Sequence, residues 1–351
     1  MFPYWLLFTL CAAGAVQYRP DLRRRAHGGA LLGFVSFVAL VLIGFRYEVG
    51  GDWGAYLGIF EQYEYAGFAE AVFKPDPGFA VLNWMAQQVG ADIWLVNLVC
   101  AALFMWGLTQ FSRQQPNPWL AILVAVPYLI IVVAMGYTRQ AVAIGLILAG
   151  MARLREHQSM VRFAVYILLA ALFHRTAVVV LPLVALAATR NRFAIAGLGA
   201  AMAATLYYAF LNADMDRLVE NYVVEDYDSQ GAAIRVAMNL VPAALFLIFP
   251  RRFALDEFER KLWRNFSYAS WVALGMLLLM SSSTVIDRLA LYLIPLQLFV
   301  FSRLPFAFSR TATANGPLTL GVIGYSALVQ FVWLTSASHA DYWLPYRFYP
   351  L

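Results

Sequence analysis

The sequence predicts an all-α polytopic membrane protein with about 12 transmembrane helices, two of them short or re-entrant, plus partly buried helices outside the bilayer. Hydrophobic residues make up 62% of the 351 residues and charged residues 13%, whereas average soluble domains carry about 25% charged residues. Apolar runs long enough for a helix to cross the hydrocarbon core recur along the chain. No soluble domain is evident, so residues 1–351 are expected to form a single transmembrane domain.

The expected spans follow the apolar runs. They cover residues 3–18, 29–46, 92–111, 118–136, 139–154, 161–174, 176–188, 193–211, 233–250, 265–283, 285–304 and 317–335. The run 161–188 is too long for one crossing and carries His174 and Arg175 in its middle, so we expect two short helices that meet at His174. Segment 77–90 contains one asparagine and two glutamines, which favours a partly buried helix outside the bilayer.

Loop charge predicts the topology. Basic residues gather in loops 19–27, 153–162, 250–264 and 302–315, and the positive-inside rule places such loops in the cytoplasm. Loop 212–232 is acidic and is expected on the opposite side, as are both termini. The net charge of +5 lies in these short clusters, so it does not indicate nucleic-acid binding.

The predicted topology brings polar and aromatic residues together at the outer ends of the spans. Arginines are disfavoured on that side, and their planar guanidinium groups suit phosphate or pyrophosphate. The candidate pyrophosphate-binding residues are Arg46, Arg139, Arg175, Arg235 and Arg288. The candidate glycan-binding residues are Tyr47, Glu48, Trp53, Tyr56, Gln140, Asn239, Asp287 and Arg347. The structural alternatives are snorkelling arginines, ion pairs and an interfacial aromatic belt.

Two residues are candidate general bases. Asp52 follows Gly50 and Gly51 in GFRYEVGGDWGAY, where glycines permit a tight turn. Its alternative role is to cap the helix that the next residues predict. His174 is a candidate because the reference pKa of histidine lies near neutral pH, and its alternative role is a hydrogen-bonded packing residue. The sequence has no motif with the ligand spacing of a metal or cofactor site, so neither is expected.

Five motifs in order resemble the EpsG-type exopolysaccharide polymerases, which are relatives of the O-antigen polymerases. They are FRYEVGGDWGAY, KPDPGFAVLNWM, YTRQAVAIGLILAGMARLR, LLAALFHRTAVVVLPL and DRLALYLIPL, and the resemblance runs from about residue 40 to the C-terminus. This chain has Asp76 where members of the family often have a glutamate before Pro-Gly-Phe.

The resemblance implies a GT-C-like polymerase in the bacterial inner membrane that acts on undecaprenyl-pyrophosphate-linked oligosaccharides at the periplasmic face. An acceptor hydroxyl would displace undecaprenyl pyrophosphate with inversion and without a metal ion, with Arg139, Arg46 and Arg288 holding the leaving group. Segment 47–91, with re-entrant or interfacial helices, and the acidic loop 212–232 would lie in the periplasm and cap the glycan channel. A flippase and a chain-length regulator are implied partners.

Two other functions remain open from the sequence. A transporter or flippase of lipid-linked glycans also needs a basic membrane cavity, although no internal repeat is evident. An integral-membrane acyltransferase also uses histidine and arginine, but it modifies a glycan without lengthening it.

Overall fold

The structure is a computed structural model that describes residues 1–18, 26–157, 159–188, 231–279, 283–311 and 313–349, together with Phe193 and Gly197. Within these ranges the chain is helical and has no strand, which confirms the all-α prediction. The basic loop 19–27, the predicted span 193–211 and the acidic loop 212–232 lie wholly or largely outside the described residues.

Four helical stretches in the described ranges are long and apolar enough to cross a membrane: Ile93–Arg113, Pro118–Gly136, Thr284–Ala307 and Gly316–Ser336. Shorter apolar helices cover Phe2–Gln17, Gly29–Gly44, Met160–Ala171, Arg175–Ala188 and Ala232–Ile248. The predicted run 161–188 is broken as expected: α10 (Met160–Ala171) ends before His174, and a 3-10 turn (Arg175–Val179) leads into α11 (Val180–Ala188).

The described chain divides into two compact units, residues 1–175 with 301–351 and residues 176–300. In unit 1, α6 (Ile93–Arg113) packs against α2 (Ala26–Gly44) and α9 (Thr138–His157), and α9 packs against α10. Glycines allow the closest of these approaches, because a Cβ on Gly107 would lie 1.8 Å from the Gly145 carbonyl oxygen. The α6–α9 pair therefore has its backbones in contact at the centre of the unit.

The same unit contains a buried helix with an irregular middle. α7 (Pro118–Ala125) continues through a π-helical stretch, Val126–Val133, to α8 (Ala134–Gly136). π-helical segments are rare, and those that occur frequently lie at functional sites. Here the Ile131 carbonyl accepts a hydrogen bond from Trp343 Nε1 at 2.8 Å, which ties the C-terminal segment to this helix.

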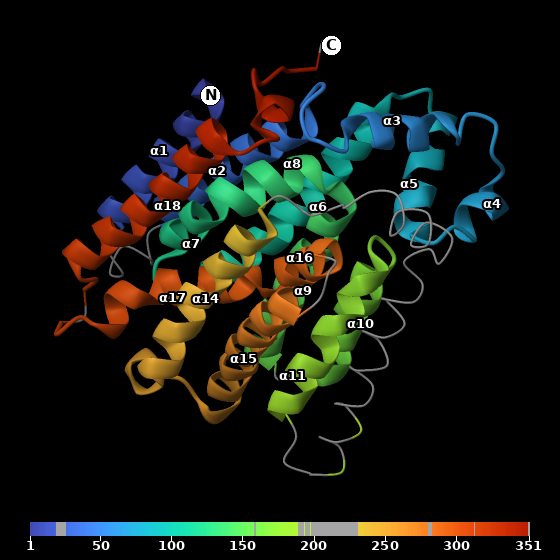
Figure 1. The fold of residues 1–351 in the computed structure, drawn as a ribbon. Coiled ribbons are helices and arrows are strands. Elements are labelled where there is room, and N and C mark those ends of the chain that lie inside the picture. The colour runs from blue at the N-terminus through green and yellow to red at the C-terminus, as the bar shows by residue number, and fades with distance from the viewer. Residues whose placement is uncertain are drawn as a thin grey trace. The chain divides into compact units, whose positions relative to one another are not determined.

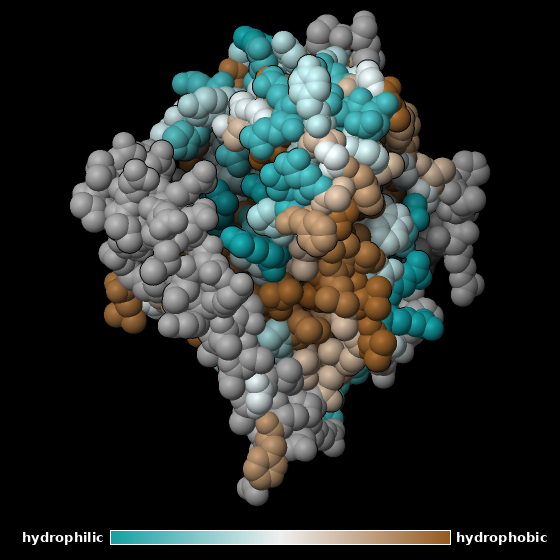
Figure 2. All heavy atoms as spheres, turned by 90° about the vertical axis from the view of Figure 1, so that its right-hand side faces the viewer, coloured by the Kyte–Doolittle hydropathy of each residue, from teal (hydrophilic) through white to brown (hydrophobic). Residues whose placement is uncertain are grey.

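Three short helices extend from one end of unit 1 (Figure 1): α3 (Trp53–Glu61), α4 (Phe68–Val72) and α5 (Pro77–Gln88). α1 (Phe2–Gln17) and α18 (Gly316–Ser336) complete the unit, and the two chain termini lie at one end of it. Figure 2 shows hydrophilic residues gathered at the height of α3, α4 and α5, above a hydrophobic band. This arrangement is typical of a helical bundle with a polar cap at one membrane interface.

Unit 2 is built from α11, α14 (Ala232–Ile248), α15 (Glu257–Leu279), α16 (Ser283–Ala290) and the first part of α17 (Ile294–Ala307). α15 packs against both α14 and α11. Aromatic rings fill one part of this core, where Trp263 stacks on Phe299 with centroids 4.0 Å apart. A second cluster joins Val236 of α14 to Ile286 and Ala290 of α16.

Candidate functional site

The C-terminal segment contacts residues that lie about 300 positions earlier in the chain. Arg46 and Phe348 form an antiparallel bridge, and the Tyr47 amide donates to the Arg347 carbonyl at 3.0 Å. The Arg347 side chain forms an ion pair with Glu48 at the surface. Three predicted glycan-binding residues, Tyr47, Glu48 and Arg347, therefore lie at one place, next to the end of α2.

Arg46 points into the protein at the end of α2. Its side chain is only 1% exposed and donates to Ile43 O at 2.8 Å, Asn97 Oδ1 at 2.9 Å and Thr138 Oγ1 at 2.8 Å. These acceptors are neutral, and among the described residues no carboxylate forms a salt bridge with Arg46. The Trp53 ring lies 5.8 Å from the guanidinium carbon. Arg46 is thus a buried positive charge held by neutral oxygens and an aromatic face.

A glycine turn sets the position of Asp52. Gly50 has φ +108° and donates its amide to Tyr342 O at 2.9 Å, and its carbonyl accepts from the Trp53 amide at 3.1 Å. Asp52 then occupies the position before α3, yet within the described chain its carboxylate accepts no capping hydrogen bond from that helix. The half-buried Asp52 side chain is therefore not used as the cap that the sequence offered as an alternative.

Arg139, the second residue of α9, forms an ion pair with Asp76. Its Nη1 lies 2.6 Å from Asp76 Oδ2, and Asp76 directly precedes α5. The guanidinium carbon lies 5.8 Å from the Tyr56 ring and 5.9 Å from the Phe79 ring, and these two rings meet edge to face. α3 and α5 thus place an aromatic pair and a carboxylate around one arginine.

The end of α10 holds Asp76 in place. The Gly78 amide donates to Leu172 O at 2.8 Å, and the Arg175 backbone amide hydrogen-bonds the Asp76 carboxylate. Burial raises the pKa of Asp76 above its usual value of 3.8, although the nearby Arg139 charge and the Arg175 amide act in the opposite direction. His174, half-buried, is the residue immediately before Arg175, so this predicted base lies at the same helix end.

Unit 2 holds a polar cluster of its own. Arg235 of α14 forms a buried ion pair with Asp287 of α16. Asn239 donates to Ala290 O at 2.9 Å and accepts from Gln297 Nε2 at 2.7 Å. Arg288, the next residue after Asp287, is exposed. The structure therefore joins Arg235, Asp287 and Asn239 inside unit 2.

The predicted set is divided between the two units. Unit 1 contains Arg46, Tyr47, Glu48, Asp52, Trp53, Tyr56, Arg139, Gln140, His174, Arg175 and Arg347. Sequence reasoning did not select Asp76, Phe79, Asn97 or Thr138 as site residues. Asp76, Phe79 and Thr138 nevertheless lie in two of the motifs on which the resemblance rests. Within the described ranges no three His, Cys, Asp or Glu residues gather as a metal site would require.

The model of the EpsG family matches residues 29–348 of the chain. No curated protein and no solved structure matches the chain. The matched segment contains every residue of the Arg139–Asp76 and Arg46–Trp53 arrangements.

Proposed function

Because the chain belongs to the EpsG family, we propose that it is a membrane polysaccharide polymerase that transfers a growing undecaprenyl-pyrophosphate-linked glycan onto a lipid-linked repeat unit. Family membership supports a glycan polymerase, and the apolar helices support a membrane location. The proposal places the protein in the bacterial inner membrane with both termini and the site in the periplasm. It also includes the GT-C-like fold with about 12 spans, and a flippase and a chain-length regulator as partners.

One observation carries the proposal: Arg139 lies beside two aromatic rings and is paired with a carboxylate at the start of a different helix. Asp76 contacts Nη1 and orients the guanidinium toward an incoming pyrophosphate, and bidentate phosphate contacts favour arginine. Arg139 is about one-third exposed, so a ligand reaches it from outside. Arg46 is buried, and in this proposal it adds positive charge beneath Trp53.

The proposed reaction is a single displacement. The acceptor hydroxyl oxygen attacks the anomeric carbon of the donor, the bond to the pyrophosphate oxygen breaks, and that electron pair leaves with undecaprenyl pyrophosphate. The hydroxyl proton passes to Asp52 or His174. Arginines that bind the leaving group more tightly as its charge develops lower the barrier. The product has inverted configuration, and the guanidinium groups supply the positive charge without a metal ion.

The remaining predicted residues keep their proposed roles. Tyr47, Trp53, Tyr56 and Gln140 bind glycan together with the Glu48–Arg347 pair, and Arg175 binds pyrophosphate near Asp76. For unit 2, considered by itself, Arg235 and Arg288 are proposed to bind pyrophosphate, and Asn239 and Asp287 to bind glycan.

A polymerisation assay tests the function. Purified full-length protein is incubated with an undecaprenyl-pyrophosphate-linked repeat unit from its host, without nucleotide sugar and with a chelator, and the products are resolved by mass spectrometry. We expect a ladder spaced by whole repeat units that is lost in Arg139→Ala and Asp52→Asn. Arg310→Ala, an exposed arginine distant from this site in sequence, is the matched control and keeps the ladder.

The outcomes separate the candidate functions. A repeat unit that gains mass without lengthening points to acyl transfer, and a substrate that only changes leaflet in proteoliposomes points to transport. A full ladder from well-folded Arg139→Ala protein overturns the assignment of Arg139 as the pyrophosphate-binding residue.

A further inference from the structure

A cavity of about 670 Å³ lies between α6, α9 and α10. Its Arg153 follows Arg139 by 14 residues on α9, so the cavity lies toward the other end of that helix from the Arg139–Asp76 pair. Its lining residues are Leu103, Trp106, Leu146, Arg153, Arg162, Val165, Tyr166 and Leu169. The volume lies within the range of small-molecule sites, about 300–1,000 Å³. All of these residues belong to unit 1.

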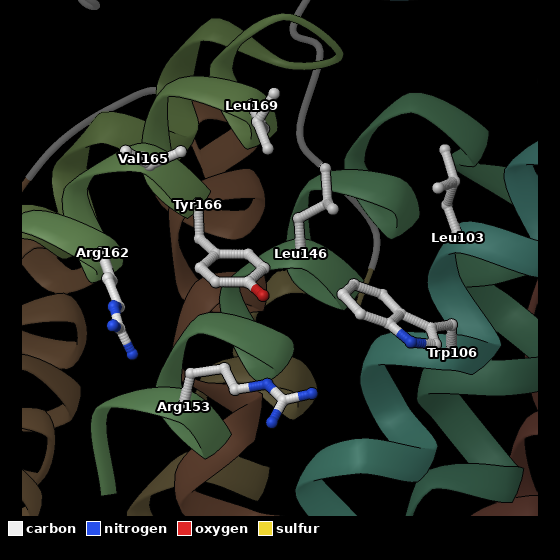
Figure 3. Close-up of a pocket in the computed structure, with 8 residues that line it drawn as sticks. All are labelled: Leu103, Trp106, Leu146, Arg153, Arg162, Val165, Tyr166 and Leu169. Carbon is white, nitrogen blue, oxygen red and sulfur yellow. The ribbon is translucent and has the colours of Figure 1, made fainter. Parts of the chain in front are cut away.

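The lining is divided into a basic end and an apolar end. Figure 3 shows the guanidinium groups of Arg153 and Arg162 below the Tyr166 ring, and Leu103, Val165 and Leu169 above it. Arg153 belongs to α9 and Arg162 to α10, so two helices supply the charge. The Trp106 and Tyr166 rings stack with centroids 6.3 Å apart between the two ends.

The helix ends around the arginines are fixed by hydrogen bonds. Gln114 Nε2 donates to Ala152 O at 2.7 Å, and Arg155 Nη1 donates to Gln114 O at 2.6 Å. A Cβ on Gly150 would lie 2.8 Å from Tyr166 Cβ, so α9 and α10 are in close contact beside the cavity. The basic end of the cavity is therefore formed by three helices whose ends are held together by packing and hydrogen bonds.

The apolar end is open to the outside of the protein. Val165 is 50% exposed, Leu169 43% and Trp106 40%. These residues lie on apolar helices, and the arginines lie where α9 ends and α10 begins, a region that loop charge predicts to be cytoplasmic. A ligand with an apolar chain and an anionic head matches both ends, because basic pockets between membrane helices on that side recognise lipid phosphates.

We propose that this cavity binds one anionic glycerophospholipid, with its phosphate between Arg153 and Arg162 and an acyl chain along Val165 and Leu169. The site is separate from the proposed polymerisation chemistry and does not depend on it. Tyr166 is placed to face the junction between head group and chain.

Native mass spectrometry of the full-length protein in detergent tests the proposal, with phosphatidylglycerol, phosphatidylcholine and glycerol phosphate as probes. We expect phosphatidylglycerol to bind, and Arg153→Ala/Arg162→Ala to weaken its binding about thirty-fold. Arg251→Ala/Arg310→Ala removes two exposed arginines from other loops with the same predicted location and is expected to change binding less than two-fold. Leu169→Trp fills the apolar end and is expected to weaken binding while both arginines remain.

Three results overturn the proposal. Equal weakening in the two double variants means that binding is bulk electrostatic attraction. Glycerol phosphate bound as tightly as phosphatidylglycerol means that the site takes a free phosphate. Phosphatidylcholine bound equally well means that charge does not select the lipid. If the arginine double variant does not fold, Leu169→Trp decides, because unchanged phosphatidylglycerol binding in that protein excludes this cavity.

Discussion

Arg139 Nη1 and Asp76 Oδ2 lie 2.6 Å apart, although 63 positions separate the two residues. The pair connects the first turn of α9 to the residue before α5, and the Tyr56 and Phe79 rings lie beside the guanidinium. Arg139 is paired with the Asp76 carboxylate and remains partly exposed, so Asp76 orients the guanidinium. An anionic substrate must therefore share the guanidinium with Asp76.

Asp76→Asn is expected to reduce polymerisation about 100-fold, because a misplaced binding group costs this much in rate. The amide keeps the size of the side chain but loses the charge that orients Arg139. Asp76→Glu is expected to retain activity within a few-fold, since it keeps the carboxylate. The measurement is the initial rate of repeat-unit addition for both variants and the wild type. Equal rates in the wild type and Asp76→Asn would show that the pair is not needed.

Asp76 is expected to make the folded protein more stable as the pH falls. Its pKa in the folded protein is raised by burial above the usual 3.8. The folded state then binds the proton more tightly, so this group contributes stability that is fully present below 3.8 and is lost as pH rises through the folded value. We expect the melting temperature of the wild type relative to Asp76→Asn to rise as pH is lowered from 7 to about 4. A relative melting temperature that falls over this range would show that the ion pair outweighs burial.

The sequence predicted the helical class because continuous apolar runs leave few alternatives in a membrane. It also predicted the break at His174, because the run 161–188 is too long for one crossing and carries His174 and Arg175 in its middle. These conclusions need only the length and composition of the apolar runs and the charge of the loops.

The site could be predicted only in part, because its contacts are not local. Arg139 stood out as a charge at the start of an apolar run, but nothing in the sequence near it indicates Asp76 as its partner. Likewise, charge patterns could not show that Arg46 turns inward to Asn97 and Thr138, whereas an outward-facing arginine has the same sequence signature. Asp287 pairs with Arg235, 52 positions earlier in the chain, and nothing in the sequence near Asp287 indicates that partner.

Gly50→Ala is expected to destabilise the protein by about 1–3 kcal/mol and to abolish polymerisation. Its φ of +108° is unfavourable for alanine, and the added Cβ would lie 2.2 Å from the Met135 carbonyl oxygen. The turn before Asp52 must then move. Gly51→Ala is the matched control, because its Cβ would meet the Trp343 ring at 3.7 Å, an ordinary contact. Thermal unfolding and polymerisation rates of both variants are the measurements, and equal behaviour of the two variants would contradict the role of the turn.

The buried Arg235–Asp287 pair predicts strongly non-additive effects in unit 2. Arg235→Met leaves the Asp287 carboxylate buried without this partner, and such a change costs about 3–5 kcal/mol of unfolding free energy. Arg235→Met/Asp287→Leu removes both charges and is expected to cost much less than the sum of the single changes, because two apolar side chains replace the pair. Denaturant unfolding of the wild type, the two single variants and the double variant completes the cycle. Additive losses would show that the two side chains stabilise unit 2 independently. Loss of polymerisation in a correctly folded double variant would favour a direct role of this pair in binding substrate.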